Sequence, residues 1–154
     1  MADLVFNTAL GRVTQLVDNV EQNNPAAAVI RMHAWVCTAA DDDVNNQDDV
    51  AALEALASNT EATNSGYANQ SWEAADITIT VNDTTNLVDI DSTDVTFSAI
   101  VAGSNWTDVS ISYDAAGTDT DASTLLLTFH DFVVTPNGGD ITANFAAAGW
   151  YQAT

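Results

Sequence analysis

The feature that most constrains the fold is an alternation of apolar and polar residues along residues 75–101, ADITITVNDTTNLVDIDSTDVTFSAIV. A period of two places successive side chains on opposite faces of a β-strand. One face of each run is apolar and the other carries Thr, Ser and Asp, which is typical of an antiparallel sheet with one buried face. We therefore expect this stretch to form the strands that hold the subunit together.

Two amphipathic helices are expected in the N-terminal third of the chain. From Asn7 onward, apolar residues recur every three or four positions, and Asn7 or Thr8 can cap the start of this helix. It is expected to stop before Pro25, because the residue before a proline is disfavoured in helical geometry. The spacing of residues 50–57 predicts the second helix, which follows a solvated acidic loop at residues 41–49.

The segment at residues 28–38 is expected to be a strand covered on both sides, with a subunit contact as the alternative. One face is apolar, and the other carries Arg31, His33, Trp35 and Cys37, which is not a plainly polar set. Alternation predicts further strands near residues 109–113 and 141–145, and the apolar run at residues 125–134 predicts a buried central strand. The expected fold is α+β, mainly antiparallel β-sheet in a sandwich or partly open barrel, with the two helices in the N-terminal third and a single domain spanning residues 1–154.

The charge of the chain is extreme. It has 22 acidic residues against two arginines, and its formal net charge is −20. At low salt such a surface repels itself and destabilises the compact state. At about 1 M salt the Debye length falls to roughly 3 Å, so neighbouring carboxylates hardly interact. The composition therefore indicates adaptation to a hypersaline medium, and an ordinary acidic protein with a biased composition is the alternative.

This charge also excludes several classes of partner. Nucleic acids and anionic membrane surfaces are bound through clusters of Lys and Arg, whereas Arg12 and Arg31 are the only such residues in the chain. No apolar run approaches the ~18 residues of a membrane span, and the N-terminus lacks the basic start of a secretion signal. Cys37 is the only cysteine, so packing rather than an intrachain disulfide is expected to stabilise the fold.

Residues that often carry chemistry do not form a recognised pattern here. His33 and Cys37 share a strand face and His130 precedes Asp131, but no motif of a catalytic cysteine or of a zinc site accompanies them. Two aspartate pairs have the alternate spacing of calcium loops without the glycine and distal glutamate that complete such loops: Asp89 with Asp91, and Asp119 with Asp121. We therefore expect no catalytic residues, no cofactor and no metal site.

Three segments resemble a known family. These are FNTALGRV at residues 6–13, TNSGYA at 63–68 and DFVVTPNGGDI at 131–141. They occur in the same order and at similar distances in a family of small structural proteins of tailed viruses, which the chain resembles over nearly its full length. The resemblance implies a role in the virus particle and no particular chemistry. The chain departs from that family at Gln15, Asp18 and Asn69, where relatives carry Lys or Arg, and this departure fits a virus of a halophilic, archaeal host.

Our leading hypothesis is a non-enzymatic virion protein on the outer surface of the capsid, which acts in decoration or cementing or in a turret or fibre base. The expected partners are the major capsid protein or other virion proteins, and self-association into trimers or pentamers is expected from capsid symmetry. Because aromatic side chains dominate interface energetics and salt does not screen them, they are the candidate interface anchors: Trp35, Tyr67, Trp72, Trp106, Trp150 and Tyr151.

Two other hypotheses come from different functional classes. One is a secreted or surface-attached acidic β-rich binding module of a halophile that uses its acidic loops and calcium. The other is an enzyme that depends on Cys37, which predicts a reactive thiol. Sensitivity of folding or binding to a chelator separates the first from a virion protein, and alkylation of the native thiol tests the second.

Overall fold

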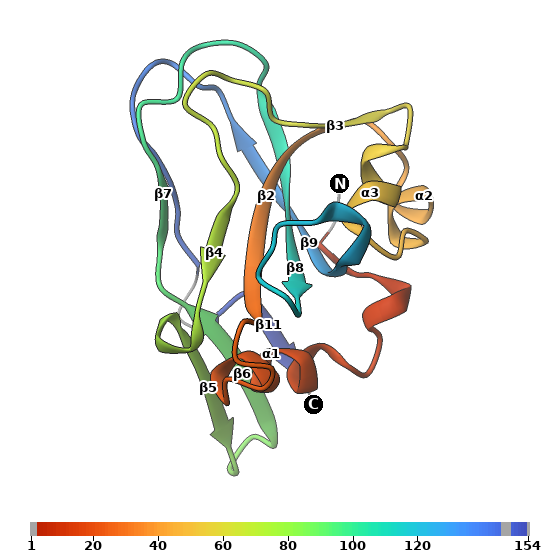
Figure 1. Ribbon diagram of the computed structural model, residues 1–154, viewed down its shortest axis with the longest axis vertical. Coiled ribbons are helices and arrows are strands. Elements are labelled where there is room, and N and C mark those ends of the chain that lie inside the picture. The colour runs from red at the N-terminus through yellow and green to blue at the C-terminus, as the bar shows by residue number, and fades with distance from the viewer. Residues whose placement is uncertain (1–2, 146–148, 154) are drawn as a thin grey trace.

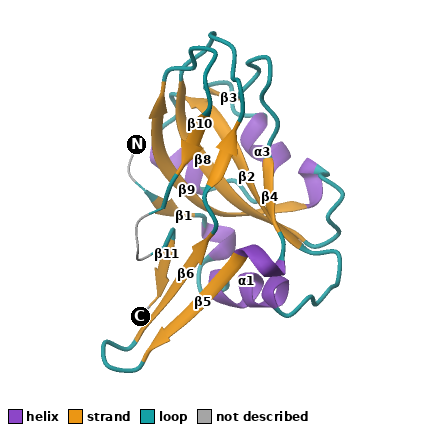
Figure 2. Cartoon of the chain, turned by 90° about the vertical axis from the view of Figure 1, so that its left-hand side faces the viewer, coloured by secondary structure: helices purple, strands orange, loops and turns teal. Residues whose placement is uncertain are grey.

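A six-stranded antiparallel sheet forms the centre of the protein (Figures 1 and 2). The computed structural model describes residues 3–145 and 149–153. The strand order is β1-β9-β8-β2-β3. The remaining strand, β4, pairs with the same edge of β2 as β3 does, but nearer the start of β2. The strands are β1 (Leu4–Val5), β2 (Val29–Cys37), β3 (Asn59–Glu61), β4 (Gln70–Trp72), β8 (Trp106–Asp114) and β9 (Thr124–Val134).

Two smaller antiparallel sheets accompany the large one. The first has the order β11-β6-β5 and consists of β5 (Ile77–Asn82), β6 (Leu87–Ser92) and β11 (Tyr151–Ala153). The second pairs β7 (Val95–Phe97) with β10 (Ile141–Ala143). The sheets do not close into a barrel. The predicted class, α+β with mainly antiparallel sheet, is confirmed.

Three short α-helices complete the described fold. They are α1 (Val13–Glu21), α2 (Asp41–Asn45) and α3 (Val50–Glu54), and single 3-10 turns lie at η1 (Asn7–Ala9), η2 (Ala74–Asp76) and η3 (Asp121–Ser123). None of the described helices is long and apolar enough to cross a membrane. In Figure 1, α2 and α3 lie together on one side of the large sheet, and α1 lies near the β5–β6 hairpin.

Apolar side chains fill the space on both faces of the central strands. The larger cluster contains the buried face of α1 together with Ile30 and Met32 of β2. The smaller cluster joins Trp35 of β2 to Val50 and Leu53 of α3. The prediction that residues 28–38 form a strand covered on both sides is therefore confirmed.

The expectation that residues 75–101 form the central scaffold is wrong. This stretch does form strands, but β5 and β6 belong to the small three-stranded sheet, and β7 pairs with β10 instead of β6. Val81 of β5 is 65% exposed. The physical reason is that alternation identifies a strand without locating it in the fold: β8 also alternates, yet its polar residues Ser110 and Ser112 are fully buried.

The first helix begins later than its sequence pattern predicts. Residues 7–9 form only the 3-10 turn η1, and α1 starts at Val13 with no side-chain cap. Gly11 lies between them with a φ of 73°, which an α-helix cannot contain. Leu10 consequently leaves the apolar stripe and is 61% exposed.

The segment expected to be a solvated loop at residues 41–49 contains regular structure, and so does the polar segment at residues 61–73. Three aspartates form the first turn of α2, where the positive end of the helix dipole stabilises negative charge. Asp49 caps α3, since its side chain accepts a hydrogen bond of 2.8 Å from the backbone N–H of Ala52. The second segment contains β4, which pairs with β2.

Candidate functional site

Four of the six predicted interface anchors are core residues. Trp35, Trp72, Trp106 and Trp150 are between 0% and 5% exposed. Each indole N–H also has a hydrogen-bond acceptor 2.8–2.9 Å away within the chain, and these acceptors are Ser110 Oγ, the Thr93 carbonyl, Asn64 Oδ1 and Ser92 Oγ, in that order. Their prediction as contact residues is therefore corrected, because side chains buried in their own subunit have no surface left to offer a partner.

The remaining two predicted anchors are half-buried. The Tyr67 hydroxyl donates to Glu61 Oε1 at 2.6 Å and accepts from the backbone N–H of Ala34 at 2.9 Å. Burial and the neighbouring Glu61 carboxylate raise the pKa of Tyr67. The ring packs edge-on against Trp106, with centroids 5.4 Å apart. Tyr67 is thus tied into the fold, while Tyr151 lies in the short strand β11.

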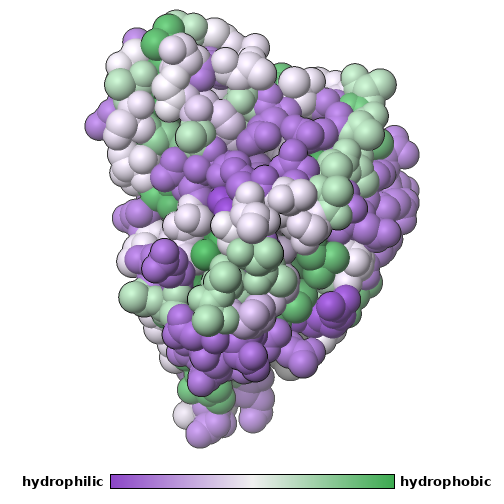
Figure 3. Space-filling view, viewed as in Figure 1, coloured by the Kyte–Doolittle hydropathy of each residue, from purple (hydrophilic) through white to green (hydrophobic). Residues whose placement is uncertain are grey.

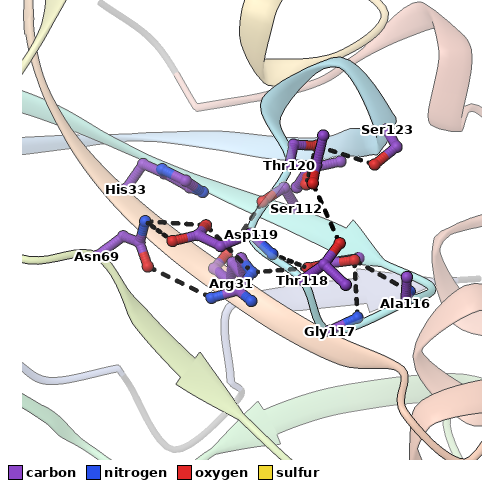
Figure 4. A network of polar contacts seen from close by, with 12 residues as sticks. Arg31, His33, Asn69, Ser112, Ala116, Gly117, Thr118, Asp119, Thr120 and Ser123 are labelled. Carbon is purple, nitrogen blue, oxygen red and sulfur yellow. Dashed lines mark hydrogen bonds and ion pairs between the residues drawn. The ribbon is translucent and has the colours of Figure 1, made fainter.

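The buried arginine of β2 organises a polar network, shown in Figure 4. Arg31 is 8% exposed and its Nε lies 2.9 Å from Asp114 Oδ2 and 3.4 Å from Asp119 Oδ1. Its Nη1 donates to Asn69 Oδ1 at 3.4 Å. One of the two cations of the chain is therefore used inside the fold, where it neutralises carboxylates of β8 and of the following loop.

Asp114 connects this arginine to the loop that follows β8. Its two carboxylate oxygens accept backbone N–H groups of Ala116, Gly117 and Asp119 at 2.9–3.0 Å. Burial alone raises the pKa of Asp114, but the backbone N–H of Asp119 and the guanidinium of Arg31 outweigh burial and lower the pKa. The network holds the loop against β2.

His33 and Glu61 extend the polar region along the same face of β2. His33 is fully buried, and its Nδ1 lies 3.1 Å from Glu61 Oε1. The hydrogen bonds from His33 and Tyr67 lower the pKa of Glu61 against the opposing effect of burial. Burial and the charges of Asp121 and Glu61 raise the pKa of Glu54. The region concentrates carboxylates, but the described residues include no group of three or more ligands that could hold a metal ion.

The residues considered for nucleophilic chemistry do not come together. Cys37 and His33 are four residues apart on one strand, a separation of about 13 Å, and Trp35 lies between them. Burial raises the pKa of the Cys37 thiol, which disfavours the reactive thiolate. His130 lies on β9 and contacts Thr128 Oγ1 at 2.9 Å through Nε2. Cys37 and His33 are therefore too far apart on the strand for a direct hydrogen bond.

A pocket of about 260 Å³ lies beside His130. Its walls include the aromatic residues Phe132, Phe145 and Trp150, and Asp3 contributes a carboxylate whose Oδ2 is 3.6 Å from His130 Nδ1. Burial lowers the pKa of His130. Sequence reasoning missed this pocket, because its lining comes from the N-terminus, β2, β8, β9 and the C-terminal segment, and no local pattern connects them.

Hydrophobic surface is scattered in small groups among hydrophilic residues on the face shown in Figure 3. Among the residues that the structure describes, the exposed large aliphatic side chains are Leu10, Val81, Val101 and Val133. Val81 belongs to the hairpin of β5 and β6, which extends away from the large sheet in Figures 1 and 2. Exposed surface therefore favours positions such as these, and not the tryptophans, as candidate contacts.

Comparison of the chain with protein-family models, curated proteins and solved structures finds no match.

Proposed function

We propose that the protein is a non-enzymatic structural component of a tailed-virus particle that is adapted to high salt. It decorates or cements the outer surface of the capsid, or forms part of a turret or fibre base. Its partners are the major capsid protein or other virion proteins, and it assembles into a homo-oligomer, a trimer or a pentamer. Nucleic acid and membranes are not among its partners.

The proposal rests on the backbone hydrogen bonds that two of the family-like segments make. Segments 63–68 and 131–141 lie far apart in the sequence, yet both bond the backbone of residues 98–101. Val101 N–H donates to the Ser65 carbonyl at 3.0 Å, and Gly138 N–H donates to the Ile100 carbonyl at 2.8 Å. These motif residues hold the main chain in place and do not present reactive groups, which is what we expect of a structural protein.

Side chains of the same segments support this reading. Asn64 is 9% exposed, accepts the indole N–H of Trp106 at 2.9 Å and donates to the Val101 carbonyl at 3.1 Å. Gly66 has a φ of 92°, and a side chain there would meet the Ala99 carbonyl. The TNSGYA sequence thus matches the steric and hydrogen-bonding demands of one loop.

The charge favours the outside of the particle over its interior. Packaged nucleic acid would repel a subunit with a formal charge of −20, whereas an acidic exterior keeps particles dispersed in brine. The first turn of α2, with Asp41, Asp42 and Asp43 all exposed, is one such acidic surface. Attachment then depends on exposed aliphatic side chains and strand edges, which salt does not weaken.

Mass spectrometry of purified virions before and after protease treatment of intact particles tests this function. We expect the protein in every particle preparation, at a copy number that follows capsid symmetry, and we expect protease treatment to remove it. A protein that is abundant in infected cells and missing from particles would overturn the proposal. An unfolding midpoint at high salt that falls on addition of EDTA would favour a calcium-dependent binding module.

A further inference from the structure

The outer edge of β5 is free among the described residues. In the sheet β11-β6-β5 the middle strand is β6, so β5 forms one edge. Its pairing with β6 runs from Ile77 opposite Ser92 to Asn82 opposite Leu87 without a shift in register. Alternate residues of such an edge strand direct their backbone N–H and C=O groups away from the sheet, where they can pair with another strand.

This edge lacks the charged and proline residues that usually prevent strand pairing, while α1 packs against β5. The sequence of β5, ITITVN, has no charged residue and no proline, although the chain has 22 acidic residues. The other strands that end a sheet in the described fold are shorter: β1 has two residues, and β3, β4, β7, β10 and β11 have three each. An uncharged, regular and exposed edge is suited to pairing with another chain.

The charge of the protein decides which surface two copies can share. Two bodies of formal charge −20 repel one another wherever their acidic surfaces approach. The β5–β6 hairpin extends from the rest of the molecule (Figures 1 and 2), so two hairpins can overlap while the acidic bodies stay apart. High salt removes the remaining repulsion and leaves the backbone hydrogen bonds and apolar contacts of the strands.

We propose that two copies of the chain associate by antiparallel pairing of their β5 edges, which joins two three-stranded sheets into one continuous sheet. A two-fold axis at Thr80 places Ile79 opposite Val81 and Thr78 opposite Asn82. Apolar side chains then meet apolar ones, and polar side chains meet polar ones. A register shifted by one residue would set Ile79 against Thr80 and mix the two faces.

The contact is independent of the proposed role in a particle. If the pairing is wrong, the purified protein will not form the expected dimer. If the virion role is wrong, the protein will be missing from purified particles. The two-fold contact is also compatible with a trimer or pentamer built through other surfaces, because the edge of β5 links one copy to one other copy.

Sedimentation of the purified protein tests the pairing. At about 1 M salt we expect a dimer whose dissociation constant rises at least about tenfold in the variant Val81→Lys, since edge lysines oppose strand pairing. Lysine lowers the net negative charge, so general electrostatics alone predicts stronger association. Val133→Lys is the matched control, because Val133 is also exposed and lies on β9. A monomeric wild type, or equal effects of both variants, overturns the proposal.

Disulfide cross-linking tests the register without weakening the contact. Thr80→Cys places a thiol on the two-fold axis, while the native Cys37 is buried. We expect this variant to form a covalent dimer on oxidation at high salt. Thr60→Cys, an exposed threonine on the edge strand β3, is the control and should remain monomeric. Equal cross-linking of the two variants would contradict the pairing.

Discussion

The central strands and the β5–β6 hairpin are both antiparallel β-structure, but their side chains have opposite environments. Seven residues of β2 are buried, and its polar residues Arg31 and His33 have partners inside the fold. Only Ile77 is buried in β5, and its polar residues face solvent. The difference teaches that alternation identifies a strand but not its burial, because β8 alternates apolar residues with Ser110 and Ser112 and is nevertheless buried on both faces.

The largest expected loss of stability comes from removing the buried cation of the central sheet. Arg31→Gln leaves the Asp114 carboxylate buried without its charge partner, and we expect a loss of about 3–5 kcal/mol in the free energy of unfolding. Arg12→Gln makes the same change in net charge at an exposed position and should have little effect. Urea unfolding at fixed high salt measures both. Similar losses would show that Arg31 acts only through net charge.

A second substitution tests the stability of the three-stranded sheet β11-β6-β5. Gly149 has a φ of 74°, and a Cβ there would overlap the Ile90 carbonyl, which accepts the backbone N–H of Trp150 at 3.0 Å. We expect Gly149→Ala to cost about 3 kcal/mol through backbone strain and the displacement of β11 from β6.

Gly138→Ala is the matched control for this substitution. Gly138 has a similar positive φ of 95° but open space around its Cβ position. It should therefore cost only about 1 kcal/mol, from backbone conformation alone. Thermal unfolding of the two variants compares them, and equal losses would mean that the overlap with Ile90 is relieved without cost.

A smaller effect is expected at the loop that contacts residues 98–101. Asn64→Ala leaves the buried indole N–H of Trp106 without its acceptor and should cost about 2 kcal/mol. In the background of Trp106→Phe, which has no donor, the same substitution should cost less. A double-mutant cycle measures this difference. Additive losses would show that the hydrogen bond does not couple the two residues.

The smallest expected effect concerns the pH dependence of stability. The pKa of Glu54 is raised, so the folded state holds its proton more tightly and stability should rise as the pH falls from neutral toward that pKa. The pKa of Asp114 is lowered, so its contribution is present above about pH 4 and is lost as the pH falls through its folded-state pKa. Glu54→Gln should reduce the rise in unfolding free energy that occurs as the pH falls from neutral. It should leave the loss of stability at lower pH unchanged. An unaltered profile would contradict this assignment.

Much of the secondary structure could be predicted from the sequence, because local patterns determine it. Residues 28–38 were identified as a strand covered on both sides, and the structure confirms this. The late start of α1 was missed, because the apolar periodicity continues across Gly11, whose φ of 73° ends the helical geometry there. The strand order was also beyond prediction, because β7 pairs with β10, more than forty residues further along the chain.

The candidate contact residues were predicted less well than the fold. Tryptophan is common in interfaces and in cores, and only the positions of its partners distinguish the two. Ser110, Asn64 and Ser92 accept three of the four indole N–H groups, and each is distant in sequence from its tryptophan. The uncharged edge of β5 was visible in the sequence, but its position at the edge of a sheet required the topology.

Amide hydrogen exchange, measured residue by residue at high salt and at several protein concentrations, tests most directly the claim that the central sheet holds the fold and the β5 edge makes the contact. We predict slow exchange throughout β2 and β8 at every concentration. In β5, the amides that face outward should exchange quickly in dilute protein and slow down as the concentration rises. Exchange in β5 that does not change with concentration would contradict the account.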